Sequence, residues 1–159
     1  MDTAKPSQAS PDFRDLQAGA LANEGTGPLR RNGSARRRLL LVEDDESIRS
    51  AVCKVATEWL GIDVTVATNG RAAAMQLNAA PWDLLMTDIL MPEMDGLELI
   101  RLARGLKSAP VIIAMSGGGS YGIDHIQVAR IFGASFVLPK PFAAAELIEI
   151  LRRAIFGGP

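Results

Sequence analysis

The chain is poor in the residues on which disulfide, zinc and membrane sites depend. It has one cysteine and one histidine among 159 residues. The single cysteine, Cys53, excludes an internal disulfide, and the single histidine, His125, excludes a zinc site built from several histidines. No apolar run is long enough to cross a bilayer, and the start of the chain lacks the apolar segment of a signal peptide. We therefore expect a cytoplasmic protein without a membrane partner. In it Cys53 is a small, semi-buried hydrophobic residue, and His125 is structural or solvated.

The composition is that of a folded domain with some surplus chain. Hydrophobic residues make up 48% of the sequence and charged residues 22%, which is enough apolar material for a substantial core. Residues 1–36 are rich in proline, glycine and serine, and we expect a flexible, disordered leader there. One folded domain is expected over residues 37–157, with no output domain. The basic run Arg36, Arg37, Arg38 is expected to solubilise the chain, and no nucleic-acid partner is expected.

From Arg38 onward, short apolar runs alternate with segments of helical periodicity. This pattern is typical of repeated strand and helix units around a parallel sheet. The predicted strands are Leu39 to Glu43, Asp63 to Ala67, Leu84 to Asp88, Val111 to Met115, and Phe136 to Leu138. The predicted helices cover about Ser47 to Leu60, Gly70 to Ala79, Leu97 to Lys107, Ile123 to Phe132, and Ala143 to Phe156.

Capping residues and one proline refine this layout. Asp45 is placed to cap the first helix and Asn69 the second, while Asp95 with Glu98 resembles a capping box for the third. Pro139 lies at the end of the fifth strand, and proline cannot donate a hydrogen bond to a strand ladder. The fifth strand is therefore predicted to lie at an edge of the sheet.

Polar residues of particular types follow four of the predicted strands. They are Glu43, Asp44 and Asp45 after the first strand, Asp88 after the third, Ser116 after the fourth, and Lys140 after the fifth. Ligands of open parallel sheets bind outside the carboxyl ends of the strands, at the point where the crossover direction reverses. We therefore expect these residues to meet in one crevice, except that Asp45 has the simpler role of a helix cap.

Crowded carboxylates repel one another unless a divalent cation lies among them. Mg²⁺ fits best, because it prefers oxygen ligands and combines one or two carboxylates with phosphate oxygens. Asp44 and Asp88 are the predicted direct ligands. Asp88 could then attack a phosphoryl group in line and hold it as an acyl phosphate. Lys140 and Ser116 would bind the phosphoryl oxygens, since phosphoryl transfer needs mainly positioning and charge neutralisation.

Four stretches resemble the receiver domain of bacterial two-component response regulators. They are LLLVEDDESIR at 39–49, DLLMTDILMPEMDGLELI at 83–100, PVIIAMSG at 110–117, and GASFVLPKPF at 133–142. The resemblance covers about residues 37–157. It implies an α/β, flavodoxin-like (βα)5 fold, a doubly wound parallel sheet in strand order 2-1-3-4-5. It also implies a cis peptide bond between Lys140 and Pro141.

The resemblance also implies a role for each site residue. Asp88 falls on the phosphoacceptor, Ser116 on the conserved hydroxyl position, and Lys140 on the invariant lysine. The implied ligands of Mg²⁺ are Asp44 and Asp88 directly, Glu43 through a water molecule, and Leu90 through its backbone carbonyl.

Such a protein is a phosphoacceptor in signalling and catalyses only its own Mg²⁺-dependent phosphorylation and dephosphorylation. The implied donor is a sensor histidine kinase or a histidine phosphotransfer protein. The implied output is a phosphorelay, or the binding of a downstream protein through the fourth helix, fifth strand and fifth helix. With no output domain expected, the chain resembles a stand-alone receiver.

One position departs from the family pattern. Three residues before the lysine the family usually has tyrosine or phenylalanine, and this chain has Val137. Phe136 is adjacent, but successive strand residues point to opposite faces, so Phe136 cannot replace the aromatic without a bulge. Tyr121, in the glycine-rich loop SGGGSYG, is a candidate substitute as reporter of phosphorylation.

Three rival functions compete with this interpretation, and the residues favour each of them less. The first is a pseudo-receiver, an interaction module that acts without phosphorylation. The second is a flavin-binding protein, in which the Ser/Gly loop after the fourth strand would cradle phosphate. Such sites want that loop after the first strand, where this chain has carboxylates that would repel phosphate without a metal. The third is a phosphohydrolase with an aspartate nucleophile, which would want a second aspartate where Leu90 stands.

Overall fold

The structure is a computed structural model that describes residues 36–91, 94–117 and 125–157. The predicted leader, apart from Arg36, and Tyr121 lie outside the described residues. Among the described residues, no helix combines the length and apolar character needed to span a bilayer.

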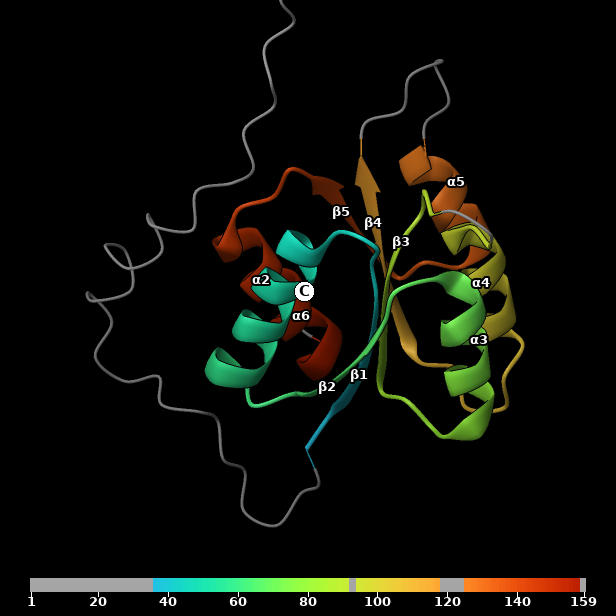
Figure 1. The fold of residues 1–159 in the computed structure, drawn as a ribbon, viewed down its shortest axis with the longest axis horizontal. Helices are drawn as coiled ribbons and strands as arrows, with labels where there is room; N and C mark the ends of the chain where they lie inside the picture. Colours follow the sequence, from blue (N-terminus) through green and yellow to red (C-terminus); the bar gives the residue numbers. More distant parts are fainter. Residues whose placement is uncertain (1–35, 92–93, 118–124, 158–159) are drawn as a thin grey trace, which may run out of the picture.

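A parallel sheet of five strands forms the centre of the domain, in the order β2-β1-β3-β4-β5 (Figure 1). The strands are β1 (Arg38–Val42), β2 (Asp63–Ala67), β3 (Leu84–Asp88), β4 (Val111–Gly117) and β5 (Phe136–Lys140). The predicted α/β fold and strand order are confirmed, and so is the edge position of β5 with Pro139. The peptide bond between Lys140 and Pro141 is cis, as the family resemblance implied.

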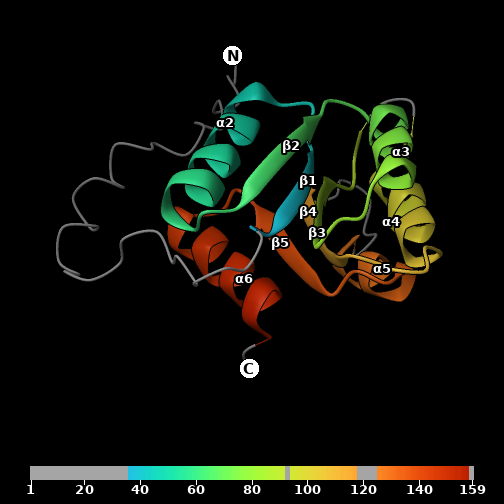
Figure 2. The same cartoon turned by 90° about the horizontal axis from the view of Figure 1, so that it is seen from below.

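Helices cover both faces of the sheet. They are α2 (Glu46–Lys54), continued by the π-helical η3 (Val55–Trp59), then α3 (Gly70–Ala79), α4 (Gly96–Arg104), α5 (His125–Phe132) and α6 (Ala144–Phe156). Helices α2 and α6 lie on one face, and α3, α4 and α5 lie on the other (Figures 1 and 2). The domain is therefore a three-layer sandwich, as expected for a doubly wound sheet.

The alternation of side chains along each strand divides the core into two clusters. Leu39 and Leu41 of β1 pack with α2, η3 and α6, whereas Leu40 and Val42 pack with α3, α4 and α5. All four side chains are fully buried. Because each face of the sheet is covered, both alternate sets are apolar, which explains the continuous apolar runs in the sequence.

The predicted helix caps are confirmed. The Asp45 carboxylate accepts hydrogen bonds from the backbone N–H groups of Ser47 and Ile48, at 2.8 and 3.1 Å. Asn69 accepts from the N–H of Ala72 at the start of α3, at 2.8 Å. At the start of α4, Asp95 accepts from the N–H of Glu98 at 2.8 Å, which is one of the two bonds of the predicted capping box. At the start of α6 the bond is reversed, because the Glu146 carboxylate accepts from the N–H of the cap residue Ala143 at 2.7 Å.

The first helix differs from the prediction in its second half. An α-helix was expected to continue to Leu60, but it changes to π-helix at Val55. The Thr57 hydroxyl donates to the carbonyl of Cys53 at 2.7 Å, and such bonds to the preceding turn perturb regular α-helix. Cys53 is half-buried against the core, and burial raises the pKa of its thiol, which agrees with a structural role.

The basic run Arg36, Arg37, Arg38 is paired at the start of β1, although Arg36 and Arg37 remain exposed. Arg36 lies 3.2 Å from Asp63, Arg37 lies 2.8 Å from Asp83, and the Arg38 guanidinium lies 4.4 Å from the centroid of the Trp82 ring. Asp83 also accepts a hydrogen bond from the backbone N–H of Arg38 at 2.8 Å. The run therefore fixes the start of β1 to the starts of its two neighbours in the sheet.

Gly96, the first residue of α4, lies against the end of β3. A Cβ at this position would collide with the carbonyl oxygen of Asp88 and lie 2.8 Å from its carbonyl carbon. The N–H of Gly96 donates to the carbonyl of Ile89 at 2.9 Å. Only glycine permits this approach, so Gly96 sets the position of the backbone that carries Asp88.

Replacement of Asp83 is expected to destabilise the fold. Asp83→Ala should lower the free energy of unfolding by about 1–2 kcal/mol, because it leaves the N–H of Arg38 without its acceptor. Although burial opposes it, the Arg38 amide and the Arg37 guanidinium hold the pKa of Asp83 below its usual value of 3.8. The stabilisation is therefore present above pH 3.8 and is lost as the pH falls through the lower pKa of the folded state.

Urea unfolding of wild type and variant at several pH values measures this difference. Asp63→Ala, which removes only the exposed pair with Arg36, is the control and should change stability by less than about 0.5 kcal/mol. Equal losses from the two substitutions would contradict the role given to Asp83.

A methyl group at Gly96 is expected to be tolerated poorly. Gly96→Ala should destabilise the protein by about 1–3 kcal/mol, because the backbone of Asp88 must shift to admit it. Gly105→Ala is the matched control at the other end of α4, where the nearest atom to a Cβ is 3.4 Å away. Urea unfolding of both variants checks the prediction, and a stable Gly96→Ala protein would show that the approach is not tight.

Candidate functional site

The carboxyl ends of the strands lie along one edge of the sheet, the upper edge in Figure 1. Glu43 follows β1 directly, Asp88 is the last residue of β3, and Lys140 is the last residue of β5. The register places Asp88 beside Met115 of β4, and places Gly117 beside Lys140. The structure thus brings together the strand ends that the sequence predicted to form one crevice.

Lys140 joins two of these ends. Its ammonium lies 2.6 Å from Oε2 of Glu43 and 2.7 Å from Oδ2 of Asp88. The lysine side chain is 15% exposed, and those of Glu43 and Asp88 are 0% and 9% exposed. Burial alone would lower the pKa of Lys140, but its hydrogen bonds to Asp88 and Glu43 outweigh burial and raise the pKa. The ammonium form of Lys140 is therefore favoured between two buried carboxylates.

Glu43 is the most deeply buried acidic group of the site. Its burial raises the pKa of its carboxyl group, while the hydrogen bond and the charge of Lys140 oppose this shift. Oε1 of Glu43 accepts from the backbone N–H of Asp45 at 3.2 Å. Both carboxylate oxygens of Glu43 are thus engaged by donors from the chain.

Asp88 is fixed through both carboxylate oxygens and through its backbone. Oδ2 accepts from Lys140, and Oδ1 accepts from the N–H of Leu90 at 3.2 Å. The hydroxyl of buried Thr87 donates to the Asp88 carbonyl at 2.9 Å. The carboxylate therefore has one orientation, held by a cation on one oxygen and an amide on the other.

Asp44 completes a cluster that can hold a metal ion. One carboxylate oxygen from each of Glu43, Asp44 and Asp88 lies within 4.8 Å of the others, and Asp44 is exposed. Three carboxylates face the single ammonium of Lys140, so the cluster has an excess of negative charge. An all-oxygen donor set with such an excess fits a hard divalent cation such as Mg²⁺.

Ser116 lies near the carboxyl end of β4, and its hydroxyl bonds within its own strand. It is 5% exposed, and its hydroxyl donates to the carbonyl of Gly117 at 3.5 Å. Ser116 was predicted to follow β4, but β4 continues through Ser116 and Gly117 because they pair with Pro139 and Lys140 of β5. The prediction of the strand end was therefore two residues short.

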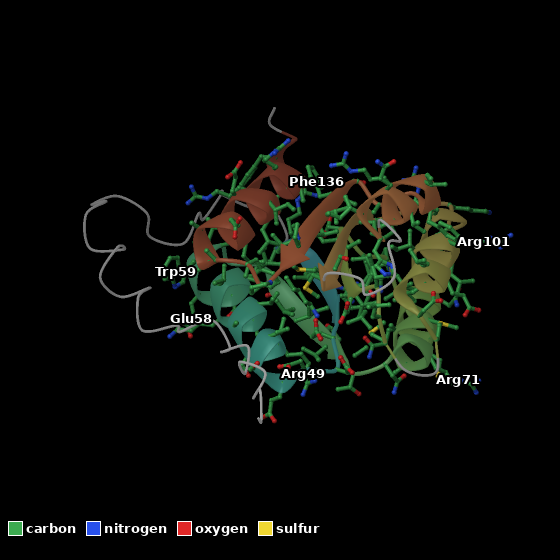
Figure 3. All side chains as sticks on the ribbon, turned by 90° about the horizontal axis from the view of Figure 1, so that it is seen from above. Arg49, Glu58, Trp59, Arg71, Arg101 and Phe136 are labelled. Carbon is green, nitrogen blue, oxygen red and sulfur yellow. The ribbon has the colours of Figure 1, made fainter. Side chains whose placement is uncertain are left out.

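Val137 and Phe136 point to opposite faces of β5, as expected. Val137 is paired with Ala114 and packs against the cluster beneath α3, α4 and α5. Phe136 packs on the other face, where the guanidinium of Arg153 on α6 lies 5.6 Å from its ring centroid (Figure 3). Phe136 therefore does not occupy the position of the missing aromatic.

Two residues of the site were not predicted. Gly96 positions the backbone of Asp88, and Arg49 donates from Nη1 to the carbonyls of Glu43 and Asp44. Each lies inside a stretch that carries the family resemblance, at the end of LLLVEDDESIR and within DLLMTDILMPEMDGLELI. Their position in those stretches was the one feature of the sequence that could have identified them as site residues.

Comparison with known proteins identifies the family. A sequence model of the response regulator receiver domain matches residues 39–152. The chain is 35% identical to the response regulator receiver protein CpdR of Brucella abortus, over 75% of this chain and 97% of that protein. It is also 35% identical to the transcriptional regulatory protein CpxR homolog of Haemophilus influenzae, of which it spans about half, 51%.

Solved structures give the same result. The chemotaxis response regulator CheY4 of Vibrio cholerae superposes with a TM-score of 0.67 at 28% identity, over 76% of this chain and 99% of that one. The receiver domain of the Francisella response regulator 1452 superposes with a TM-score of 0.65 at 28% identity, over 75% and 96%. The chain belongs to the response regulator receiver domain family of two-component systems.

Proposed function

We propose that this protein accepts a phosphoryl group on Asp88 in a Mg²⁺-dependent reaction. The donor is a sensor histidine kinase or a histidine phosphotransfer protein, and the output is a phosphorelay or phosphorylation-dependent protein binding. The observation that carries the proposal is the Lys140 ammonium, 2.7 Å from Asp88 and 2.6 Å from Glu43, beside a cluster of three carboxylates. Phosphorylation on aspartate is general in this family.

The chain's own groups suit an in-line attack by Asp88. The N–H of Leu90 and the ammonium of Lys140 hold the carboxylate in one orientation. An Asp88 oxygen bonds to phosphorus as the bond from phosphorus to the donor nitrogen breaks, and the product is an acyl phosphate. Lys140 then neutralises a phosphoryl oxygen, and the Ser116 hydroxyl turns from Gly117 to donate to another.

Mg²⁺ would be held by Asp44 and Asp88, by Glu43 through water, and by the backbone carbonyl of Leu90, and it would neutralise charge on the phosphoryl oxygens. Asp44 is exposed, whereas Glu43 is fully buried. Asp44 therefore lies where a cation enters from solvent, and Glu43 lies behind it with Lys140. This difference supports a direct role for Asp44 and an indirect one for Glu43.

The proposed output surface consists of α5, β5 and α6. Ile131 and Phe132 at the end of α5 are 81% and 40% exposed, and Phe156 at the end of α6 is 52% exposed. Large apolar side chains in such positions suit contact with a protein partner. A stand-alone role is supported by the likeness to CpdR, 97% of whose length is matched. We propose a cytoplasmic location, since the proposed phosphoryl donors act there.

Phosphorylation should depend on Asp88 and on Mg²⁺. Incubation with phosphoramidate and Mg²⁺ is expected to add one phosphoryl group to the wild type, measured as intact mass. Asp88→Asn should gain none, because an amide lacks the nucleophilic carboxylate, and chelation of Mg²⁺ should abolish the gain in the wild type. A wild type without any gain would support the pseudo-receiver alternative, and a gain that survives Asp88→Asn would move the acceptor elsewhere.

Removal of the Lys140 charge should affect cation binding and phosphorylation in opposite directions. Lys140→Met is expected to bind Mg²⁺ more tightly, because the ammonium no longer competes for Glu43 and Asp88. Its phosphorylation rate at saturating Mg²⁺ should fall by about 100-fold, because the group that neutralises the phosphoryl oxygen is lost.

Calorimetric titration with Mg²⁺ and timed mass spectrometry measure the two quantities. Lys107→Met, an exposed lysine beyond the end of α4, should behave as wild type in both. An unchanged phosphorylation rate in Lys140→Met would rule out the role given to Lys140.

A further inference from the structure

Arg49 connects helix α2 to the segment that carries the acidic pair. Nη1 of its guanidinium donates to the carbonyl oxygen of Glu43 at 3.0 Å and to that of Asp44 at 2.6 Å. Arg49 projects from α2 in Figure 3. Both bonds have a charged donor, and bonds of this kind are roughly twice as strong as those between neutral groups.

The remaining bonds of this segment hold its two ends but not its middle. The N–H of Glu43 donates to the carbonyl of Ala67 at 3.2 Å, and the Asp45 carboxylate caps α2. Between them, Asp44 makes one hydrogen bond in the described part of the chain, the bond from Arg49. The direction of the Asp44 carboxylate therefore depends on how Arg49 holds the Asp44 peptide group.

Arg49 and Lys140 are two cations that bind different kinds of atoms. Lys140 occupies carboxylate oxygens of Glu43 and Asp88, and so competes with a metal ion for them. Arg49 binds carbonyl oxygens, and so does not compete with a metal ion for the carboxylate oxygens of Glu43 and Asp44. Arginine also stays charged at any relevant pH and is geometrically stiff at its planar group. It is thus suited to hold the backbone without blocking the ligand atoms.

We infer that Arg49 is a positioning residue for the divalent cation. It fixes the carbonyls of Glu43 and Asp44 so that the two carboxylates converge on the cation beside Asp88. This inference rests on the proposed Mg²⁺-dependent function and adds a residue to it. Arg49 contributes to Mg²⁺ affinity and has no contact with Asp88, so the phosphoryl-transfer step at saturating Mg²⁺ is largely independent of it.

The sign of the effect separates positioning from simple electrostatics. If Arg49 acted only as a nearby positive charge, its removal would tighten the binding of Mg²⁺. If Arg49 positions the segment, its removal must instead weaken the binding of Mg²⁺. Arg49→Met removes the charge and the hydrogen bonds at similar length, whereas Arg49→Lys keeps a charged donor that can reach a carbonyl.

Calorimetric titration of the full chain with Mg²⁺ alone is the primary measurement. Arg49→Met is expected to raise the dissociation constant about 10-fold, equivalent to the loss of roughly one charge-assisted hydrogen bond. Arg49→Lys should stay within about 3-fold of wild type, since it retains the charge-assisted donor. Lys54→Met, at the other end of α2, is the matched control and should leave the dissociation constant unchanged.

Phosphorylation by phosphoramidate gives the second readout. Arg49→Met should require about 10-fold more Mg²⁺ for a half-maximal rate, yet reach a rate within about 3-fold of wild type at saturation. Urea unfolding without Mg²⁺ verifies that each variant is folded. Arg49→Gln repeats the comparison with a neutral donor, so that the test does not depend on the folding of one variant, and its dissociation constant should also rise.

A dissociation constant at or below the wild-type value in both Arg49→Met and Arg49→Gln would overturn the inference. A rate that falls at saturating Mg²⁺ with unchanged Mg²⁺ binding would also overturn it. Either result with a wild type that binds Mg²⁺ and becomes phosphorylated leaves the proposed function intact. A wild type that does neither would instead overturn the proposed function.

Discussion

The contact of Lys140 with Glu43 and Asp88 is the constraint on which the site depends. It joins residues 97 and 52 positions apart in the sequence, through bonds of 2.6 and 2.7 Å. Two buried carboxylates without a cation between them would repel each other. The Lys140 ammonium offsets this repulsion and holds Glu43 and Asp88 together at the edge of the sheet. The parallel register places Lys140 at the edge where β1 and β3 end. The strand pairing that forms the sheet therefore also forms the site.

Much of the fold could be predicted because its signals are local. The bounds of β2, β3 and α3 agree with those predicted, since Asn69 marks a helix start and apolar runs mark the strands. The change to π-helix at Val55 accompanies a local bond of the Thr57 hydroxyl, whereas other differences came from contacts between distant segments. The extension of β4 to Gly117 depends on pairing with β5, and the ion pairs of the basic run depend on residues more than twenty positions away. Neither leaves a periodic trace in the sequence.

The candidate site divides in the same way. Glu43, Asp88 and Lys140 could be predicted because residue type and strand ends coincide, and parallel topology brings such ends together. Arg49 and Gly96 could not, because both act on backbone atoms: one donates to carbonyls, and the other leaves room for one. Every residue has a backbone carbonyl group, so the residue types in a sequence do not show which carbonyl a side chain will contact. The orientation of Ser116 likewise depends on a side-chain torsion that sequence does not specify.

The position of Trp82, on which Arg38 stacks, has a spectroscopic consequence. Trp82 precedes β3 and Trp59 ends η3 just before β2, so both tryptophans of the chain lie near the amino-terminal edge of the sheet. A strand of five residues separates that edge from Asp88, which is about 17 Å. Indole emission therefore reports unfolding of the sheet and is remote from the carboxylate cluster. An optical probe of the cluster must be introduced, for example at exposed Leu90, two residues beyond Asp88.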